Sequence, residues 1–367
     1  MEQKLKKILF ITNIPAPYRV DFYNELGKLC QLTVIFESNR ASVKVKYNWN
    51  DDQITNFTPI YLTTKPFNAK KIKWNIFKYL SASFDVIVVT NYAYITETLT
   101  MLYLKVRRIP FFYETDGGIV KYDESIGRKW FKKVMLSQAV GYFSPSKSSD
   151  EYLRYYTPSS SEMYRYHFTS LLEKDIVGKL PSFEREIVRQ KIGVKEKKVI
   201  LGIGRFIPRK GFDILIKAFQ QLSDPDVGLY IIGGEPTVEY KHLASGFSNI
   251  HFEGFMSKDM LKHYMLIADL FIHPTREDIW GLVINEAMSC GLPIITTSKC
   301  VAGLEFLPNE CIIPVGDVNA LVYKMKQLIG DESLLNKLSD LNLSKIKDYT
   351  IQQMVEDHLK IFTLYTK

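Results

Sequence analysis

The sequence predicts an α/β protein of two domains, each with a parallel sheet covered by helices on both faces. The chain has 367 residues with 46% hydrophobic content, which is enough for two buried cores. Apolar runs bounded by turn residues recur between segments of helical period. These runs are continuous rather than alternating, as in strands of a buried parallel sheet. The pattern breaks once, at about residues 170–197, in a charged stretch that contains Pro181.

The elements follow one another in the order typical of strand–helix units. The strand-like runs of the first half are Lys7–Thr12, Leu32–Glu37, Phe84–Asn91, Pro110–Glu114 and Val140–Ser144. Those of the second half are Lys198–Ile203, Gly228–Ile232, Ile250–Phe252, Asp269–His273, Pro293–Thr297 and Cys311–Pro314. Helical segments between them include Gly211–Leu222, Lys258–Ile267, Leu282–Ser289 and Asp317–Ile329. This alternation predicts two Rossmann-like domains.

The break in the pattern sets the expected domain boundaries. We expect a first domain at residues 1–171 and a second at 172–346, joined near residues 172–195. A last helix at about Ile351–Tyr365, within the segment 347–367, is expected to pack back towards the first domain.

The cysteines and the lengths of the apolar segments indicate the cellular compartment of the protein. The four cysteines, at positions 30, 290, 300 and 311, have neither metal-ligand spacing nor a pairing rhythm, which favours a reducing cytoplasm and no zinc site. The apolar run that follows the basic N-terminus is too short for a signal peptide, and no segment is long enough to span a bilayer. We therefore expect a cytoplasmic protein, at most peripheral on the inner face of the membrane.

Positive charge is concentrated in the first half of the chain. Residues 1–170 carry 24 Lys and Arg against 15 Asp and Glu, a net charge of +9, and the remainder has 24 against 25. This asymmetry indicates an anionic partner, either a membrane or a nucleic acid. In the segment 128–135, RKWFKKVM, apolar and basic residues form two separate arcs of a helix. We expect the apolar arc to pack on the sheet; contact with a membrane is the alternative, supported by the segment 70–79.

Charged residues lie where two strands of the second half end, and ligands of open α/β sheets bind at these ends. The strand Lys198–Ile203 is followed by Arg205, Arg209 and Lys210, of which Arg209 is expected to face solvent. A second strand, Asp269–His273, leads to a helix whose first backbone amides form an anion site. Those amides belong to Gly281, Leu282 and Val283. Two cations and a helix N-terminus together suit a diphosphate.

Two carboxylates accompany this second strand end. Glu286 lies one turn into the helix, where it can reach the vicinal hydroxyls of a ribose. Asp278 precedes the helix, on the side where a sugar attached to the diphosphate would lie. Capping of the helix is the alternative role of Asp278, and His273 is expected to be a hydrogen-bonded core histidine.

These motifs resemble the family 4 (group 1) retaining glycosyltransferases of the GT-B fold, in which two Rossmann-like domains face a cleft. The resemblance covers residues 198–316, through GxGRF and RKG at 202–211 and two acids with seven residues between them before Cys-Gly-Leu-Pro. More weakly, NIPAPYR (13–19), ETDGG (114–118) and YHFTSL (166–171) are similar to a branch that makes bacterial surface polysaccharides, including capsule. The resemblance implies transfer from a nucleotide-sugar, with a UDP-sugar favoured, to a glycan or polyprenyl-linked acceptor.

The resemblance also assigns roles to residues. Arg205 and Lys210 would neutralise the donor diphosphate without a metal, Glu286 would bind the ribose, and Asp278 would bind the donor sugar. We expect the nucleotide to be bordered by Gly204, Gly233, Phe255, Gly281, Leu282 and Val283.

The sequence departs from the family pattern at two positions. The first acid of the pair is usually Glu, and here it is Asp278. Where the family often has a His in the first domain, this chain has FYETDGG, and Asp116 is the candidate contact to donor or acceptor.

Three other functions compete with this one. A dinucleotide oxidoreductase would need a glycine-rich first strand turn, and TNIPAPYR contains no glycine. A nucleic-acid-binding protein would explain the basic half, but the chain contains no recognised motif, so we expect no nucleic-acid partner. A sugar-nucleotide epimerase of the same fold remains an enzymatic alternative.

Overall fold

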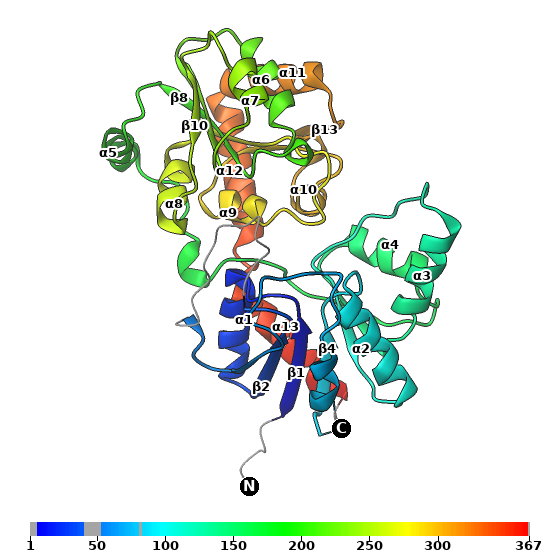
Figure 1. Cartoon of the computed structure of the whole chain (residues 1–367). Coiled ribbons are helices and arrows are strands. Elements are labelled where there is room, and N and C mark those ends of the chain that lie inside the picture. Colours follow the sequence, from blue (N-terminus) through cyan, green and yellow to red (C-terminus); the bar gives the residue numbers. More distant parts are fainter. Residues whose placement is uncertain (1–5, 40–52, 81–82, 366–367) are drawn as a thin grey trace. The chain divides into compact units, whose positions relative to one another are not determined.

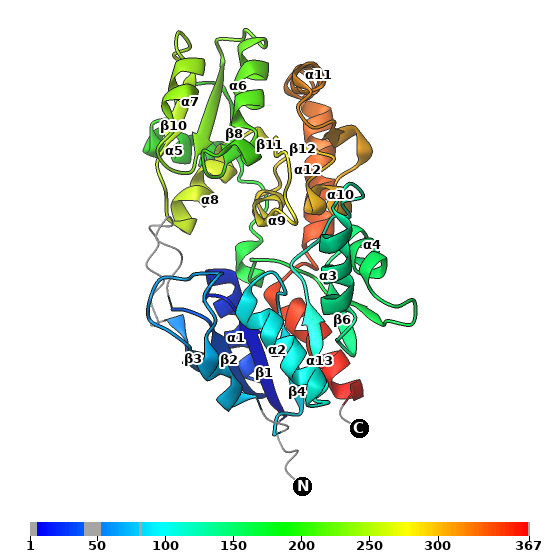
Figure 2. The same cartoon turned by 45° about the vertical axis from the view of Figure 1, so that its right-hand side comes forward.

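The computed structural model describes residues 6–39, 53–80 and 83–365. Within it the chain forms two units, and each has one parallel β-sheet (Figures 1 and 2). The first unit comprises residues 1–170 together with 350–367, and the second comprises residues 171–349. The α/β class with two Rossmann-like domains is therefore confirmed.

The first unit has a seven-stranded sheet in the order β3-β2-β1-β4-β5-β6-β7. Its strands are β1 (Lys7–Thr12), β2 (Gln31–Phe36), β3 (Thr58–Tyr61), β4 (Val86–Val89), β5 (Phe112–Glu114), β6 (Gly141–Ser144) and β7 (Met163–Arg165). Its helices are α1 (Pro17–Gly27), the 3₁₀ helix η2 (Trp74–Tyr79), α2 (Ile95–Val106), α3 (Ile126–Leu136), α4 (Lys147–Tyr156) and α13 (Ile351–Tyr365). The strand order changes side between β1 and β4: β2 and β3 lie on one side of β1, and β4 to β7 lie on the other. Open α/β sheets bind their ligands at this switch point.

The two faces of the first sheet have different cores. One is an aliphatic and tyrosine-rich cluster, in which Leu9 and Ile11 of β1 pack with Met101 and Leu104 of α2. The other is a set of aromatic rings to which α13 contributes Phe362. Helix α13 also packs against α1, and in Figure 1 the red C-terminal helix lies beside the blue one. The last helix of the chain thus belongs to the core of the first unit.

The second unit has a six-stranded sheet in the order β10-β9-β8-β11-β12-β13. Its strands are β8 (Lys198–Ile203), β9 (Val227–Ile232), β10 (Ile250–Glu253), β11 (Leu270–His273), β12 (Ile294–Thr297) and β13 (Ile312–Ile313). Its longer helices are α5 (Ser182–Ile192), α6 (Phe212–Gln220), α8 (Lys258–Ile267), α9 (Leu282–Ser289), α11 (Val318–Ile329) and α12 (Glu332–Ile346). The shorter ones are α7 (Val238–Leu243), α10 (Val301–Phe306), η3 (Glu173–Asp175), η4 (Pro208–Lys210) and η5 (Asn309–Cys311). Here the switch point lies between β8 and β11.

Three local features differ from what the sequence led us to expect. Strands β3 and β7 were not predicted, because their residues are mostly half-exposed and form no continuous apolar run. The stretch 172–195, expected to join the domains, contains helix α5, which packs against α8 in the second unit. The backbone passes to the second unit after Ser170.

No helix in the described part of the chain is long and apolar enough to cross a bilayer.

Helix α3 buries part of each arc rather than the whole apolar arc: Met135 of the apolar arc is buried, whereas Lys133 of the basic arc is exposed. Trp130 is 66% exposed and Phe131 is also exposed, although they belong to the apolar arc. Two lysines of the basic arc instead point to aromatic rings of α4: Lys129 lies over Tyr155, and Lys132 lies over the ring of Tyr156. Cation–π contacts and an ion pair of Lys132 hold these two lysines inward, and the two aromatic side chains are left at the surface.

Candidate functional site

The loop after β8 carries the two cationic residues that we assigned to a diphosphate. It leaves the strand at Gly204, passes Arg205, forms the turn η4 and ends at Gly211, where α6 begins. Gly211 has a φ of 71°, and a Cβ atom there would lie 2.0 Å from the carbonyl oxygen of Pro274, which follows β11. Only glycine permits this approach. The loop is therefore held against the end of β11, and this contact places Lys210.

Lys210 and Asp278 form an ion pair at this point. Nζ of Lys210 lies 2.6 Å from Oδ2 of Asp278, although 68 residues separate them in the chain. Nε2 of His273, the last residue of β11, lies 3.0 Å from the same oxygen. Arg209 is partly exposed, with Nη1 3.6 Å from Oδ1 of Asp278 and 2.6 Å from the carbonyl oxygen of Glu277. The structure thus brings together two of the predicted site residues and adds His273 to them.

The charge state of this group follows from its surroundings. Asp278 is 8% exposed, and burial by itself would raise its pKa. The hydrogen bond with His273 and the positive charge of Lys210 outweigh burial and hold the pKa of Asp278 well below its usual range. Burial lowers the pKa of His273, so its ring is neutral and its Nε2–H donates to Asp278. We conclude that a carboxylate is fixed between a cation and a neutral imidazole, as expected for a core histidine.

Asp278 does not cap helix α9. Its backbone pairs with that of Cys300 in a parallel bridge, and the N-cap residue is Gly281, whose φ is 102°. The capping alternative for Asp278 is therefore wrong. Among the residues that the structure describes, the backbone amides of Gly281, Leu282 and Val283 have no hydrogen-bond acceptor. These amides, at the positive end of the helix, are available to an anion.

The other charged residues predicted for this unit lie close to the same strand ends in sequence. Glu286 is half-buried in α9, one turn beyond Leu282. Arg205 is exposed, and its guanidinium has no ion-pair partner in the described ranges 6–39, 53–80 and 83–365. The positive charge of Arg205 is therefore available to a ligand at the end of β8.

The glycines and the aromatic residue expected at the nucleotide lie at the ends of the neighbouring strands. A Cβ atom on Gly233 would lie 2.0 Å from the carbonyl oxygen of Gly204, so the turns after β8 and β9 meet at two glycines. Phe255, in the loop after β10, packs against Gly234 and is exposed on its other side. Together they form a surface of bare backbone and one aromatic ring, which is suited to a planar base.

Asp116 lies in the first unit, within a buried polar network at the end of β5. Arg19 of α1 donates to Glu114 at 3.1 Å and to Asp116 at 2.5 Å, and the hydroxyl of Tyr18 donates to Asp116 at 2.9 Å. His358 of α13 contacts the other oxygen of Glu114 at 3.2 Å. Arg19 therefore bridges two carboxylates, and α1 and α13 both supply partners to the end of one strand.

The two carboxylates of this network differ in their pKa. Burial would raise the pKa of Glu114, but the hydrogen bond with His358 and the charge of Arg19 lower it. Burial and the negative charge of Glu114 raise the pKa of Asp116 despite Arg19. The side chain of Asp116 is also 25% exposed, whereas that of Glu114 is fully buried. Asp116 is accordingly the carboxylate of the pair that a ligand or a proton can reach.

Sequence reasoning missed several residues that hold these groups in place. Arg276 after β11 forms a bidentate ion pair with Asp213 of α6, at 2.9 and 2.7 Å, and its backbone N–H donates to the carbonyl oxygen of Arg209. His358 could have been found, because it lies on the apolar face of the last helix, in register with Val355 and Phe362. For Arg276 the sequence offers no such signal.

Comparison with known proteins bears on residues 184–342, which match the family model described as "Glycosyl transferases group 1". The lipopolysaccharide glucosyltransferase WaaG of Escherichia coli K12 is 35% identical over 123 residues, which make up 32% of this chain and 32% of that protein. The lipopolysaccharide core biosynthesis glycosyltransferase LpsE of Rhizobium meliloti is 27% identical over 150 residues, or 39% of this chain and 42% of that protein. The matched segments thus span only about a third of WaaG and less than half of LpsE.

Solved structures show the same fold along nearly the whole chain. HepE of Anabaena, determined in complex with UDP, has a TM-score of 0.77 at 15% identity, and the match covers 98% of this chain and 100% of that one. The crystal structure of WaaG has a TM-score of 0.69 at 17% identity and covers 97% and 99%. The fold is therefore that of the GT-B glycosyltransferases, and residues 184–342 are similar to the glycosyl transferases of group 1.

Proposed function

We propose that the protein is a retaining glycosyltransferase that moves a sugar from a nucleotide-sugar to a glycan or lipid-linked acceptor during synthesis of a surface polysaccharide, including capsule. The observation that carries this proposal is the ion pair of Lys210 and Asp278 at the ends of β8 and β11, close in sequence to the free amides that begin α9. A cation and a helix N-terminus at the switch point of a parallel sheet suit a diphosphate. The lipopolysaccharide enzymes among the relatives favour the acceptor class.

In this proposal the positive groups of the second unit assist departure of the nucleoside diphosphate. Negative charge develops on the leaving diphosphate as its bond to the sugar breaks, and fixed donors stabilise that charge more than they stabilise the bound substrate. Lys210 has three N–H donors and gives one to Asp278, so the others can reach a phosphate. Arg205 is the second cation, and we expect no metal ion to be required.

The carboxylates divide the recognition of the donor between them. Glu286 accepts hydrogen bonds from the ribose. Asp278 fixes Lys210 through Oδ2 and offers Oδ1 to a hydroxyl of the sugar. A UDP-sugar is the favoured donor, because a protein of the same fold, HepE, has been solved with UDP and with UDP and glucose.

Asp116 is proposed to contact the donor sugar or the acceptor from the first unit. Its carboxylate is held by Arg19 and Tyr18 yet remains partly accessible. A raised pKa makes it a better proton acceptor than Glu114. It would replace the histidine often found in related enzymes.

Helix α3 is proposed to contact an anionic membrane, which would keep the enzyme at the inner face of the cell membrane near lipid-linked acceptors. Ile126 is 88% exposed and lies on the same helix as the exposed rings of Trp130 and Phe131. Arg128 and Lys133 are exposed beside them. Aromatic side chains flanked by cations are typical of an interfacial helix.

A lipid-binding assay tests this part of the proposal. The protein should sediment with vesicles that contain phosphatidylglycerol and remain in solution with phosphatidylcholine alone. The double variant Trp130→Ala and Phe131→Ala should lose sedimentation. Phe183→Ala, which removes a still more exposed ring from α5, should not. Equal sedimentation of all variants would remove α3 from the proposal.

The activity itself is tested with a panel of nucleotide-sugars. At least one should raise the temperature of unfolding and be hydrolysed slowly in the absence of an acceptor. Lys210→Ala should abolish hydrolysis and keep the fold. NMR of the transferred sugar should show the anomeric configuration of the donor. If no nucleotide-sugar is bound or hydrolysed, the proposed function is wrong.

A further inference from the structure

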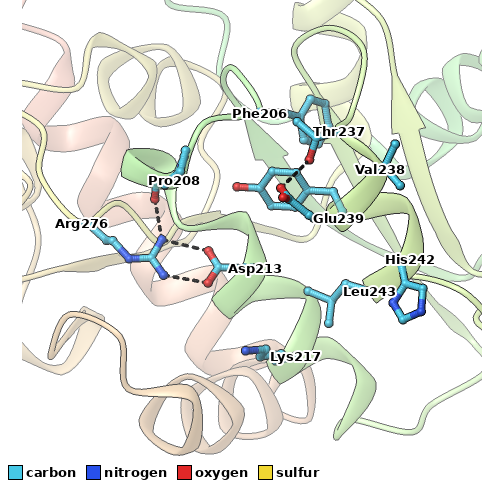
Figure 3. A pocket seen from close by; sticks show the side chains of 11 residues that line it. Phe206, Pro208, Asp213, Lys217, Thr237, Val238, Glu239, His242, Leu243 and Arg276 are labelled. Atoms are coloured by element: carbon cyan, nitrogen blue, oxygen red, sulfur yellow. Dashed lines mark hydrogen bonds and ion pairs between the residues drawn. The ribbon is translucent and has the colours of Figure 1, made fainter.

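The second unit contains a cavity of about 590 Å³ that the proposed function does not use. Its walls come from the loop after β8, from α6, from α7 and from Arg276 (Figure 3). None of the donor-site residues Lys210, Asp278, Gly281 and Glu286 lines it. The volume lies within the range of about 300–1,000 Å³ that is typical of small-molecule sites.

Tyr240 supplies an unused polar group to this cavity. The residue is 7% exposed, and its ring packs against that of Phe206 with centroids 5.5 Å apart. Tyr240 lines the cavity, and its hydroxyl has no hydrogen-bond partner among the residues that the structure describes. The hydroxyl is not one of the fully buried unpartnered groups, so it is open to solvent. It is therefore free to form a hydrogen bond with a polar ligand that displaces water from the cavity.

The charged groups around the cavity balance one another. Figure 3 shows Arg276 joined to both oxygens of Asp213 and to the carbonyl oxygen of Pro208. Glu239 accepts a hydrogen bond from the hydroxyl of Thr237 at 3.3 Å. The ammonium of Lys217 has no ion-pair partner in the described part of the chain. With two carboxylates and two cations on its walls, the cavity attracts neither anions nor cations specifically.

A neutral ligand that both donates and accepts hydrogen bonds fits this lining. Hydroxyl groups of such a ligand can form hydrogen bonds with the hydroxyl of Tyr240, the carboxylate of Glu239 and the ammonium of Lys217. Val238 and Leu243 offer apolar surface on the α7 side (Figure 3). A pyranose ring combines a hydroxylated rim with an apolar face of C–H groups, so it meets both requirements.

We propose that this cavity is a carbohydrate-binding site separate from the donor site. Its occupant is a neutral glycosyl unit, either a free sugar or a residue of a glycan chain. The proposal goes beyond the proposed transfer reaction and does not depend on it. Because Pro208 lines the cavity and also begins the turn that ends at Lys210, the two sites share one turn of the chain.

Saturation-transfer NMR on the full chain tests the site, with UDP present to occupy the donor site. The probes are methyl glycosides of glucose and galactose, and short oligosaccharides of the same sugars. Signal should pass from the protein to the ring protons of at least one glycoside. Tighter binding of the oligosaccharide would identify a glycan as the occupant, and equal binding would identify a free sugar; both results support the site.

Variants place the binding within the cavity. Tyr240→Phe removes only the hydroxyl and should weaken binding about two- to twelvefold, the worth of one neutral hydrogen bond. Val238→Trp should fill the opening and abolish binding. Tyr323→Phe, at an exposed tyrosine of α11, is the matched control and should bind like the parent. Unfolding temperatures of all three variants show that each is folded.

Two results would overturn the proposal. One is the absence of glycoside binding in the parent protein while UDP still binds. The other is glycoside binding at the donor site. UDP would then displace the glycoside, or Lys210→Ala would abolish its binding while Tyr240→Phe leaves it unchanged. The nucleotide-sugar panel tests the transfer reaction separately, so failure of one proposal does not obscure the other.

Discussion

The ion pair of Lys210 and Asp278 predicts the outcome of a double-mutant cycle. Lys210→Met keeps most of the side-chain volume and removes the ammonium. Both side chains are almost buried, at 14% and 11% exposure, and Nζ lies 2.6 Å from Oδ2. Loss of one partner of a buried pair costs about 3–5 kcal/mol, because the other charge is left uncompensated. His273 still donates to Asp278, and Arg209 lies 3.6 Å from it, so we expect the lower end of that range.

The second variant of the cycle separates pairing from other effects of the substitution. Asp278→Asn removes the negative charge at similar size. The double variant contains neither charge, so it should be more stable than the sum of the two single changes predicts. We expect this coupling to amount to about 1–3 kcal/mol, within the range for residues in contact.

Urea unfolding followed by tryptophan fluorescence measures the three free energies, and calorimetry with UDP measures binding in the same proteins. Lys210→Met should also weaken UDP binding by about ten- to over a hundredfold, the worth of one charge-assisted hydrogen bond. Lys241→Met, at the exposed pair of Lys241 and Glu235, is the matched control and should change stability by at most about 1 kcal/mol. Additive effects of Lys210→Met and Asp278→Asn would show that the pair contributes nothing in solution and would refute the reasoning.

Four further predictions follow from the same structure. Glu286→Gln should weaken UDP binding by about ten- to over a hundredfold in calorimetry and leave the unfolding temperature unchanged; unchanged affinity would exclude a ribose contact. EDTA should leave transfer activity unchanged, and a loss that Mg²⁺ or Mn²⁺ restores would show that the cations do not suffice. Arg19→Met should destabilise the protein by about 3–5 kcal/mol in urea unfolding, because Glu114 and Asp116 lose their shared partner; a cost below about 1 kcal/mol would contradict the network. Burial lowers the pKa of His273, so the unfolded chain takes up its proton first and stability falls as pH drops below about 6.5; His273→Gln should make the fall between pH 6.5 and 5 shallower, and an unchanged slope would show that His273 does not titrate in this way.

The regular elements could be predicted from the sequence because their signals are local. The predicted bounds of β1, β8, α8, α9 and α13 are those of the structure. In each, the apolar residues repeat with the period of the element that they form. Strands β3 and β7 lack that signal, because they lie at the two edges of their sheet and are only partly covered. They form strands because their backbones pair with β2 and β6. Such pairing cannot be recognised from the residues of β3 and β7 alone.

The sequence also located the two ends of the candidate donor site, though not the contact between them. Arg205 and Lys210 on one loop and Asp278 and Glu286 near another could be recognised from residue types and spacing. The ion pair between Lys210 and Asp278 exists because β8 and β11 are neighbours in the sheet and Gly211 allows their loops to touch. The same holds for His358 and Glu114, which 244 residues separate.

The fold class, the bounds of five elements and the residue types at the strand ends could thus be predicted from the sequence, because each depends on neighbours within a few turns of chain. Which charges pair, and which side chains of a helix are buried, depends on contacts between elements that are distant in sequence. For α3 the helical period defines two arcs, and the rings of Tyr155 and Tyr156 on α4 hold two lysines of the basic arc inward, while Met135 of the apolar arc is also buried. The physical reason is that a side chain's free energy depends on the partner it meets, and folding brings in partners from far along the chain.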